Sequence, residues 1–378
     1  MRWHAVNLPL NLITLLACAI AAHAQSLPQP VIEHAARAVA QTNIGTTESL
    51  STPESEGEIE RAEISEIVRK HFPADSKGAV AVLVTRDGRV LHRKGHGRKG
   101  DLPITPDTPL GLASVTKQFA AMCAAFFIDE GRLKTTDKVS THLPGVNLSV
   151  NGRELLVQDL LWHTSGLANF LDRESQVSID AYKKAHGLER MTNQTHADWL
   201  ATMPLRRAPG VKYEYTNSGY VLLARIVEVL AGKPFHEFQK ERIFDVLGMN
   251  QASDSVTFNG SGNMFVSLRD YEKWDRALWN GSLVKPETWK LMVQSGRLDN
   301  GEPVGYGFGW KVTWENGELI EMKHGGIGAP PANSRNEILR DIRQRITVAF
   351  FSREKPTITD DLKRQVVREI RDCAKGLK

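Results

Sequence analysis

The sequence has little cysteine: there are three in 378 residues, and no Cys-x-x-Cys pair among them. A fold held together by a framework of disulfide bonds is therefore excluded. Cys123 lies in an apolar helical pattern, which favours a buried free thiol, although a bond to Cys373 stays open.

Several motifs of enzyme chemistry are missing as well. There is no His-Glu-x-x-His of the zinc proteases and no Gly-x-Ser-x-Gly nucleophile turn. The segment 95–100 is rich in glycine, but no Gly-Lys-Ser/Thr follows it, so it is not a phosphate-binding loop. His92 and His96 lack a carboxylate third ligand, and we expect them to be solvated histidines of a turn. The sequence therefore predicts an activity without metal or organic cofactor.

The chain also lacks a strong charge of one sign. Its formal net charge is only +4, and acidic residues interrupt the basic stretch that follows Arg335. A continuous basic stripe is typical of nucleic-acid binding, so we expect no nucleic-acid partner and favour a small-molecule or peptide substrate. The oligomeric state stays open.

Only one long apolar run is present, from Leu8 to Ile20. It is too short to span a bilayer comfortably, and the small residues of Ala22-His23-Ala24 suit a signal peptidase. Residues 1–24 are therefore predicted to be a signal peptide of an exported protein, periplasmic or secreted. Leu15-Leu16-Ala17-Cys18 leaves a lipoprotein open, with membrane attachment only if Cys18 is lipidated.

Residues 25–58 are polar and poor in large apolar side chains, which predicts a flexible linker before a domain over 59–378. Strand patterns with a hairpin turn between them come early in that domain and return late, and the region between is mostly helical. Apolar residues surround the predicted helix 114–129 on every side, so it should be buried. The sequence thus predicts an α/β (α+β) fold, an antiparallel sheet flanked by helices, with a helical lobe inserted at about 156–269. The predicted strands are 78–84, 89–92, 307–314, 319–323 and 346–351, and the other predicted helices are 58–71, 218–230 and a C-terminal one with Leu362, Val366, Ile370 and Cys373 on one face.

Ser-x-x-Lys occurs three times, but only Ser114–Lys117 opens a long buried helix. Residues three apart on a helix share one face, so the hydroxyl and the amine should be neighbours. Burial and the helix N-terminus both lower the pKa of a lysine, and a neutral lysine can take the proton of a serine. From this motif alone, Ser114 could equally be a helix N-cap.

Two further motifs extend the pattern. Tyr215-Thr-Asn217 is the only Tyr-x-Asn, and His324-Gly-Gly326 follows a predicted strand. In this order and spacing, over about residues 60–375, the chain resembles the penicillin-recognising serine hydrolases: class C β-lactamases, D,D-peptidases and related esterases. The flanking segments that also resemble this family are Phe127–Lys134, Val157–Leu167 and Tyr215–Tyr220.

The resemblance implies a role for each matching residue. Ser114 matches the nucleophile and Lys117 its base, while Tyr215 matches the tyrosine that assists deprotonation and protonates the leaving group. Asn217 would orient Lys117 or the substrate amide. His324 stands where many relatives have lysine.

The oxyanion hole implied by the resemblance consists of the N–H groups of Ser114 and Ile327, with Gly325 and Gly326 beside the substrate. If Lys323-His324-Gly325 were the true register, Gly326 would take the place of Ile327. His163 is interpreted as structural or as a support for the site.

The chain departs from the family after His324-Gly-Gly, where Pro330 and Pro331 remove two N–H donors beside the expected substrate edge. This weakens the case for β-lactam and peptidoglycan-peptide recognition more than that for acyl transfer. We therefore expect hydrolysis of a small ester or amide, with a D-Ala-type peptide, a true β-lactamase and a non-hydrolysing penicillin-binding sensor or scaffold as alternatives.

Overall fold

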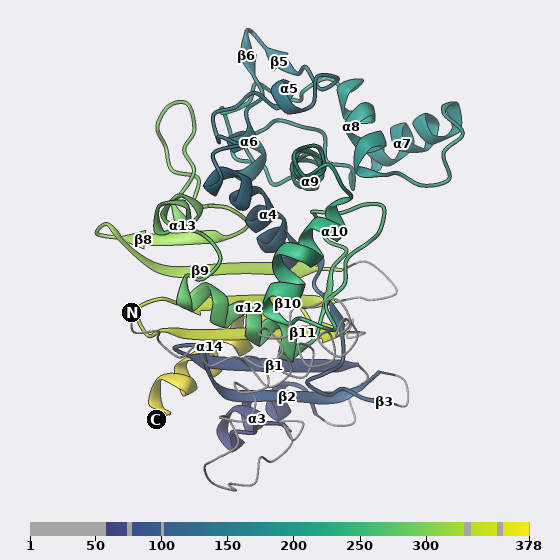
Figure 1. Ribbon diagram of the computed structural model, residues 1–378. Helices are drawn as coiled ribbons and strands as arrows, with labels where there is room; N and C mark the ends of the chain where they lie inside the picture. The colour runs from purple at the N-terminus through teal and green to yellow at the C-terminus, as the bar shows by residue number, and fades with distance from the viewer. Residues whose placement is uncertain (1–57, 74–77, 100–101, 329–333, 354–357, 378) are drawn as a thin grey trace, which may run out of the picture. The chain divides into compact units, whose positions relative to one another are not determined.

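The computed structural model describes residues 58–73, 78–99, 102–328, 334–353 and 358–377 (Figure 1). The chain divides into two units, residues 1–57 and 58–378, and only the second is described here. The predicted signal peptide, Cys18 and the predicted linker up to residue 57 lie outside the described residues, as do Pro330 and Pro331.

A seven-stranded antiparallel sheet forms the centre of the described unit, in the order β3-β2-β1-β11-β10-β9-β8. The early strand β1 pairs along its whole length with the late strand β11, so two distant segments make one sheet, as predicted. The strands are β1 Ala79–Arg86, β2 Arg89–Lys99, β3 Leu102–Pro103, β8 Lys311–Glu315, β9 Glu318–Ile327, β10 Arg335–Asp341 and β11 Ile346–Arg353. Two small sheets accompany it: β4 Leu110–Gly111 with β7 Phe265–Val266, and β5 Ser149–Val150 with β6 Arg153–Glu154.

The turn between β1 and β2 has the conformation that its sequence predicts. Asp87 and Gly88 have φ of 53° and 74°. Two central residues with positive φ make the hairpin turn whose twist matches that of the strands, and Asp-Gly is a favoured pair for it.

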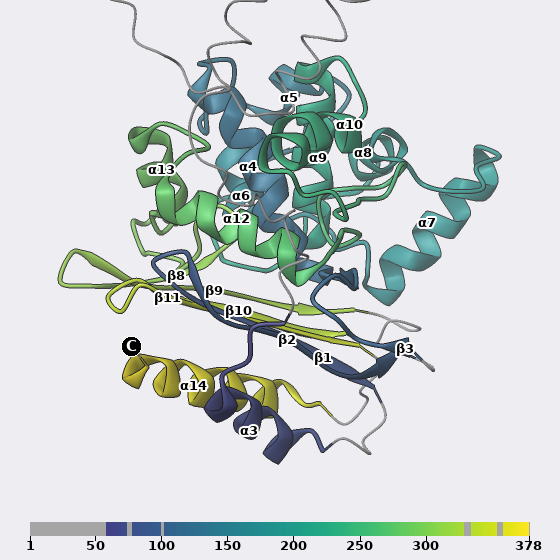
Figure 2. The ribbon, with the colours of Figure 1, turned by 60° about the horizontal axis from the view of Figure 1, so that its bottom comes forward.

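Two helices cover one face of the sheet, α3 Ala62–His71 and α14 Asp360–Gly376 (Figure 2). Val80 and Val82 of β1 point into this layer, while Ala81 and Leu83 point into the opposite layer. β1 is therefore buried on both faces. On α14 the predicted apolar face is confirmed at Val366 and Ile370, whereas Leu362 and Cys373 are only partly buried.

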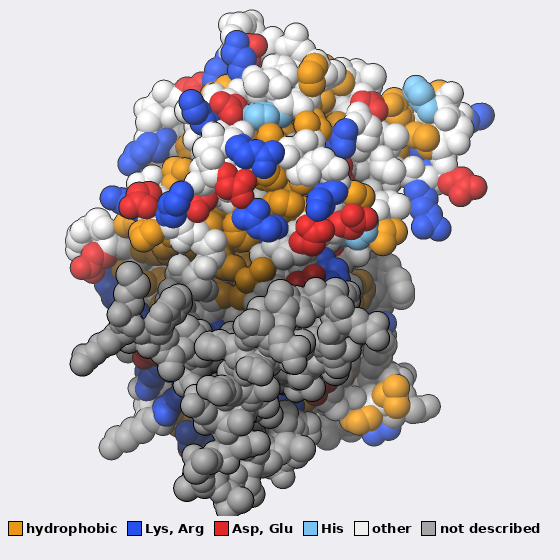
Figure 3. All heavy atoms as spheres, viewed as in Figure 1, with side chains coloured by type: hydrophobic (Ala, Val, Ile, Leu, Met, Phe, Trp, Pro, Cys, Tyr) orange, Lys and Arg blue, Asp and Glu red, His pale blue; other side chains and the backbone are white. Residues whose placement is uncertain are grey.

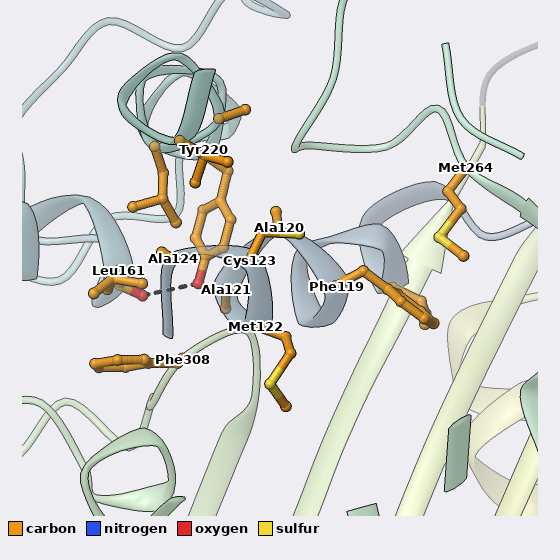
Figure 4. Close-up of a cluster of buried hydrophobic side chains, with 14 of the residues drawn as sticks. Phe119, Ala120, Ala121, Met122, Cys123, Ala124, Leu161, Tyr220, Met264 and Phe308 are labelled. Carbon is orange, nitrogen blue, oxygen red and sulfur yellow. Dashed lines mark hydrogen bonds between the residues drawn. The ribbon is translucent and has the colours of Figure 1, made fainter. Parts of the chain in front are cut away.

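The opposite face holds the larger core, built around α4 Lys117–Asp129. Alanines on α4 let α9 Asn217–Ala231 approach closely, and Tyr220 of α9 reaches over them to donate to the carbonyl of Leu161 at 3.0 Å (Figure 4). The prediction that the helix now identified as α4 is buried on every side is confirmed. The other helices of this half are α5 Val139–His142, α6 Val157–Leu161, α7 Arg173–Ala185, α8 Asn193–Ala201, α10 Phe235–Gln239, a π-helical turn Lys240–Phe244, α11 Asp245–Leu247, α12 Leu268–Asn280 and α13 Pro286–Val293.

Two predicted strand regions differ from the structure. The strand expected over 307–314 begins only at Lys311, because Gly309 (φ 76°) lies in a loop against α4, where a β-carbon would be 2.6 Å from the carbonyl oxygen of Lys117. β10 was not predicted, since its first residues are polar. Asn336 and Glu337 are nevertheless buried there.

The prediction that His92 and His96 are solvated turn residues is wrong. Both lie within β2, and their rings stack with centroids 6.1 Å apart. His92 is fully buried and its Nδ1 accepts from the N–H of Arg61 at 3.1 Å. Burial lowers the pKa of His92 to about 3 and that of His96 to about 4, so both are neutral at pH 7.

Candidate active site

Ser114 lies in a 3-10 turn, Ala113–Thr116, that joins β4 to α4. α4 itself begins at Lys117, so Ser114 precedes the α-helix by one turn instead of opening it. Ala113 has φ of 48°, a conformation that costs energy for a residue other than glycine and that clusters at functional sites. The backbone is thus strained immediately before the candidate nucleophile.

Lys117 is fully buried, and three oxygen atoms lie within hydrogen-bond range of its amine. Nζ lies 3.4 Å from Oγ of Ser114 and donates to Oδ1 of Asn217 at 2.7 Å and to the carbonyl of Ser261 at 2.8 Å. Burial lowers its pKa well below the ordinary value. A neutral amine has two hydrogens, which Asn217 and Ser261 can accept, so its lone pair is left for the proton of Ser114.

The ring of Tyr215 lies beside that amine, with its centroid 4.9 Å from Nζ of Lys117. The ring of His163 packs against it with centroids 4.2 Å apart. Burial raises the pKa of Tyr215, and the neighbouring hydroxyl of Ser114 offsets part of the rise. A neutral Lys117 and a protonated Tyr215 are therefore the favoured pair, so the amine is the better base for Ser114.

Asn217 begins α9 and connects this helix to Lys117. Its Nδ2 donates to Oδ1 of Asn169 at 3.3 Å, and its own N–H donates to the same oxygen at 3.2 Å. These contacts orient the side-chain amide with Oδ1 toward Lys117. Asn217 can therefore position the amine of Lys117.

His324 enters from β9 and is held at both ring nitrogens. Nδ1 lies 2.8 Å from the carbonyl oxygen of Gly325, and Nε2 lies 2.9 Å from the hydroxyl of Tyr306. Burial lowers the pKa of His324 to about 3. In the neutral ring Nδ1 donates to the carbonyl, and Nε2 accepts from Tyr306.

Gly326 is where β9 touches the turn that contains Ser114. A β-carbon at this position would lie 2.5 Å from the carbonyl oxygen of Leu112 and 3.2 Å from the nitrogen of Ser114. At Gly325, on the other face of the strand, a β-carbon would meet Oε2 of Glu337 at 2.8 Å. Only a glycine at position 326 lets β9 approach the backbone of the Ser114 turn this closely.

The direction of the N–H of Ile327 follows from the β9–β10 ladder. Ile327 lies opposite Arg335, and the N–H of Gly328 donates to the carbonyl of Ser334 at 3.0 Å. Opposing residues alternate between bonded and non-bonded pairs in an antiparallel ladder. The N–H of Gly326 therefore points to β10, whereas that of Ile327 points away from it.

The other edge of β9 is open beyond Lys323, because β8 pairs only with residues 318–323 among the described residues. Ile327 is 57% exposed on this part of the strand. The ladder therefore favours the N–H of Ile327 over that of Gly326 as an oxyanion donor beside Ser114.

Three residues that contact the site were not named as site residues from the sequence: Ser261, Tyr306 and Asn169. Ser261 acts through its carbonyl, which no side-chain pattern reveals. His163 lies as interpreted, in support: its Nδ1 accepts from the N–H of Thr216 at 3.3 Å. It is buried against the rings of Tyr215, Tyr220 and Tyr306.

Within the described ranges, no three His, Cys, Asp or Glu side chains gather where they could hold a metal ion. Cys123 is a buried free thiol there, as predicted, and Cys373 is a free, partly buried one. No helix in the same ranges has the length and apolar character needed to cross a membrane.

The comparison with family models agrees with this geometry. The model of the Beta-lactamase family matches residues 68–370, which include all the candidate residues described above. The chain belongs to the Beta-lactamase family. The resemblance seen in the three motifs is thereby confirmed, and with it the predicted fold class.

Relatives in this family are distant. PbpX of Bacillus subtilis (strain 168), whose given name assigns it to the penicillin-binding proteins, is 26% identical over 262 residues. That match covers 61% of this chain and 61% of PbpX, so the chain spans less than two thirds of that relative. Protein flp of Staphylococcus aureus (strain NCTC 8325 / PS 47) is 23% identical over 363 residues, which cover 85% of this chain and 68% of flp.

Solved structures share the fold. The hydrolase EstCE1, described as having promiscuous acyltransferase activity, superposes with a TM-score of 0.65 at 19% identity, covering 83% of this chain and 98% of that one. The β-lactamase/D-alanine carboxypeptidase of Yersinia pestis superposes with a TM-score of 0.64 at 20% identity, covering 82% of this chain and 98% of that one. The D-amino acid amidase of Ochrobactrum anthropi SV3 superposes with a TM-score of 0.65 at 18% identity, covering 83% of this chain and 98% of that one.

Proposed function

We propose that the protein is a serine hydrolase that transfers the acyl group of a small ester or amide to Ser114 and then to water. The observation that carries the proposal is the environment of Lys117. Its buried amine has a lowered pKa, two acceptors for its hydrogens and the hydroxyl of Ser114 at 3.4 Å. This is the arrangement that a lysine base needs.

In the proposed acylation, Lys117 takes the proton of Ser114 as Oγ attacks the substrate carbonyl carbon. The negative charge on the carbonyl oxygen is stabilised by the N–H groups of Ser114 and Ile327. As the tetrahedral intermediate collapses, Tyr215 donates its proton to the leaving group and receives one from Lys117. The bond from carbonyl to leaving group breaks, and the ester to Ser114 remains.

Water then clears the acyl group by the same route in reverse. As water attacks the ester carbonyl, Tyr215 takes one proton from it and passes its own proton to Lys117. When the tetrahedral intermediate collapses, the bond to Oγ of Ser114 breaks and Lys117 returns the proton to Oγ. The acid leaves, and the free enzyme is restored without a metal or an organic cofactor.

The substrate is proposed at the level of its class. Two structural neighbours are named as a β-lactamase/D-alanine carboxypeptidase and a D-amino acid amidase, so a D-Ala-type peptide is one candidate. A true β-lactamase and a non-hydrolysing sensor are the others. The complete set Ser114, Lys117, Tyr215 and Asn217 favours turnover, because a binding scaffold has no need of the buried base.

Export to the periplasm or medium, with or without lipidation of Cys18, is part of the same proposal and rests on residues 1–24. A nucleic-acid partner is not proposed. On the face seen in Figure 3, Lys and Arg are interspersed with Asp and Glu over the helical half, and no surface of one sign is formed there.

Turnover of activated esters, D-amino acid amides and a penicillin by the purified protein tests the proposal. We expect hydrolysis of an ester or amide that disappears in Ser114→Ala and falls at least about a thousandfold in Lys117→Ala. Intact mass after exposure to penicillin separates the alternatives. A persistent adduct indicates a penicillin-binding peptidase or sensor, and consumption of the penicillin without an adduct indicates a β-lactamase. If there is no adduct and the penicillin is not consumed, the protein is an esterase or amidase.

A further inference from the structure

Tyr215 lies on a segment without regular structure. Residues 212–216 belong to no helix or strand, and α9 begins only at Asn217. Within the described residues, the buried hydroxyl of Tyr215 has no hydrogen-bond partner. A general acid must lie within hydrogen-bond reach of the atom that it protonates. The position of this hydroxyl therefore depends on what holds the ring of Tyr215 and the backbone on either side of it.

His163 contacts the chain on both sides of Tyr215. Its carbonyl accepts from the N–H of Glu214 at 2.8 Å, and its Nδ1 accepts from the N–H of Thr216 at 3.3 Å. Its ring packs against the phenol of Tyr215, with centroids 4.2 Å apart. A single residue thus binds the backbone before Tyr215, the ring of Tyr215 and the backbone after it.

His163 is itself held firmly. It is fully buried, and its φ of 59° is a strained conformation of the kind that clusters at functional sites. The next residue, Thr164, donates through its N–H and its hydroxyl to Asp159 of α6, at 2.9 Å and 3.0 Å. The carbonyl of Thr164 accepts from the N–H of Gly210 at 2.9 Å. The loop therefore fixes the segment of Tyr215 to α6.

We propose that His163 is a positioning residue for Tyr215, and that cleavage of substrates with strongly basic leaving groups depends on it. In the proposed acylation, the bond from the carbonyl carbon to the leaving atom breaks, and its electron pair stays on that atom. The leaving atom takes the phenolic proton of Tyr215, and Lys117 then gives its proton to the phenolate. The inference rests on the proposed serine hydrolase function and adds that alkyl esters and amides depend on His163 more than activated aryl esters do.

Two esters that differ by one methylene test the inference: 4-nitrophenyl acetate, whose phenolate leaves without a proton, and 4-nitrobenzyl acetate, whose alkoxide does not. In Tyr215→Phe we expect kcat/KM to fall about a hundredfold more for the benzyl ester than for the phenyl ester. In His163→Ala the ratio of the two kcat/KM values should move in the same direction by about tenfold or more. His92→Ala should leave the ratio unchanged. It is the matched control, because His92 is also fully buried and its Nδ1 also accepts a backbone N–H.

Two further variants test whether His163 acts through Tyr215. When His163→Ala is added to Tyr215→Phe, the ratio should not move further, because the acid is already lost. His163→Asn keeps an acceptor for the N–H of Thr216, and asparagine tolerates a positive φ. Its ratio should therefore lie between those of the wild type and His163→Ala, shifted by about threefold or more.

A wild-type ratio in a folded His163→Ala overturns the inference, as does an equal shift in His92→Ala or a full additional shift on top of Tyr215→Phe. So does a wild type that hydrolyses only the phenyl ester, because no proton then reaches the leaving group. If His163→Ala does not fold, an unchanged ratio in His163→Asn overturns the inference. Failure of the proposed function is a different result: neither ester is hydrolysed by the wild type any faster than by Ser114→Ala.

Discussion

At the scale of single residues, burial decides what the candidate groups can do. Lys117 and Tyr215 have ordinary pKa values on the same side of neutrality, yet burial lowers that of the amine and raises that of the phenol. The two shifts together make the amine the better proton acceptor. The residue types could be read from the sequence, but their protonation states depend on packing that only the fold defines.

Individual residues also show where sequence reasoning stops. Ser114, Lys117, Tyr215 and His324 can be proposed from the sequence because side chains carry their chemistry, and the structure brings them together. Ser261 was missed because it contributes a carbonyl. The prediction for His92 and His96 is wrong because a Lys/Gly-rich stretch is typical of a turn, whereas here Gly95 lies within β2, where a β-carbon would be 2.1 Å from the carbonyl oxygen of Ile104.

The close contact at Gly326 gives a first prediction. Gly326→Ala places a β-carbon 2.5 Å from the carbonyl oxygen of Leu112, so β9 or the turn of Ser114 must shift. We expect ester hydrolysis to fall about tenfold or more and the protein to lose about 1–3 kcal/mol of unfolding free energy. Gly145→Ala, where a β-carbon meets nothing within 4 Å, is the matched control. Wild-type activity in Gly326→Ala would contradict the described contact.

At the scale of elements, the sheet was predictable where hydrophobic patterns mark it and hidden where polar side chains are buried. β1 and β11 are mostly apolar, and the sequence predicts that the early and late strands share one sheet. β10 begins with polar residues, and Asn336 is buried because it bridges two neighbours. Its Nδ2 donates to the carbonyl of Gly111 at 2.8 Å, and its Oδ1 accepts from the N–H of Ser352 at 3.1 Å.

One carboxylate attaches α12 to three strands. Asp275 accepts from Thr85 of β1 at 2.6 Å and from Thr347 of β11 at 2.7 Å, and it lies 3.4 Å from Nε of Arg340 on β10. Asp275→Ala leaves a buried guanidinium without its carboxylate, so we expect a loss of about 3–5 kcal/mol in urea unfolding. Asp180→Ala, an exposed aspartate on α7, should change stability by less than about 0.5 kcal/mol. Equal effects of the two substitutions would contradict the described role of Asp275.

At the scale of the whole molecule, buried histidines make stability depend on pH. Burial lowers the pKa of His92, His196 and His324 to about 3 and that of His96 to about 4, from 6.5. Below pH 6.5 the unfolded chain binds protons that the folded protein does not. The contribution of these neutral histidines to the free energy of unfolding is therefore fully present above pH 6.5. It decreases as the pH falls, by about 2 kcal/mol per histidine at pH 5.

Asp254 acts in the opposite direction. Burial raises the pKa of Asp254 from 3.8 to about 7. Burying this carboxyl group therefore lowers the free energy of unfolding at pH 7, and this destabilisation decreases as the pH falls to 5. Burial also raises the pKa of Asp159 and of Asp275, and these carboxyl groups act in the same direction as Asp254. We expect the four histidines to outweigh the carboxyl groups and the urea midpoint to be lower at pH 5 than at pH 7.

His196→Phe isolates one histidine, because His196 packs among Phe170, Trp199 and Phe258 and its Nε2 has no hydrogen-bond partner among the described residues. Its stability difference between pH 7 and pH 5 should be about 2 kcal/mol smaller than that of the wild type. An identical pH dependence in the two proteins would rule out a neutral, buried His196.

The proposed function depends most on the acylation of Ser114. The most direct test is the intact mass and peptide map of the wild type and of Ser114→Ala after exposure to a fluorophosphonate probe, with both proteins shown to be folded by circular dichroism. We predict one adduct on the wild type, on the peptide that contains Ser114, and none on Ser114→Ala. An adduct of equal yield on Ser114→Ala, or on another serine of the wild type, would contradict the assignment of the nucleophile.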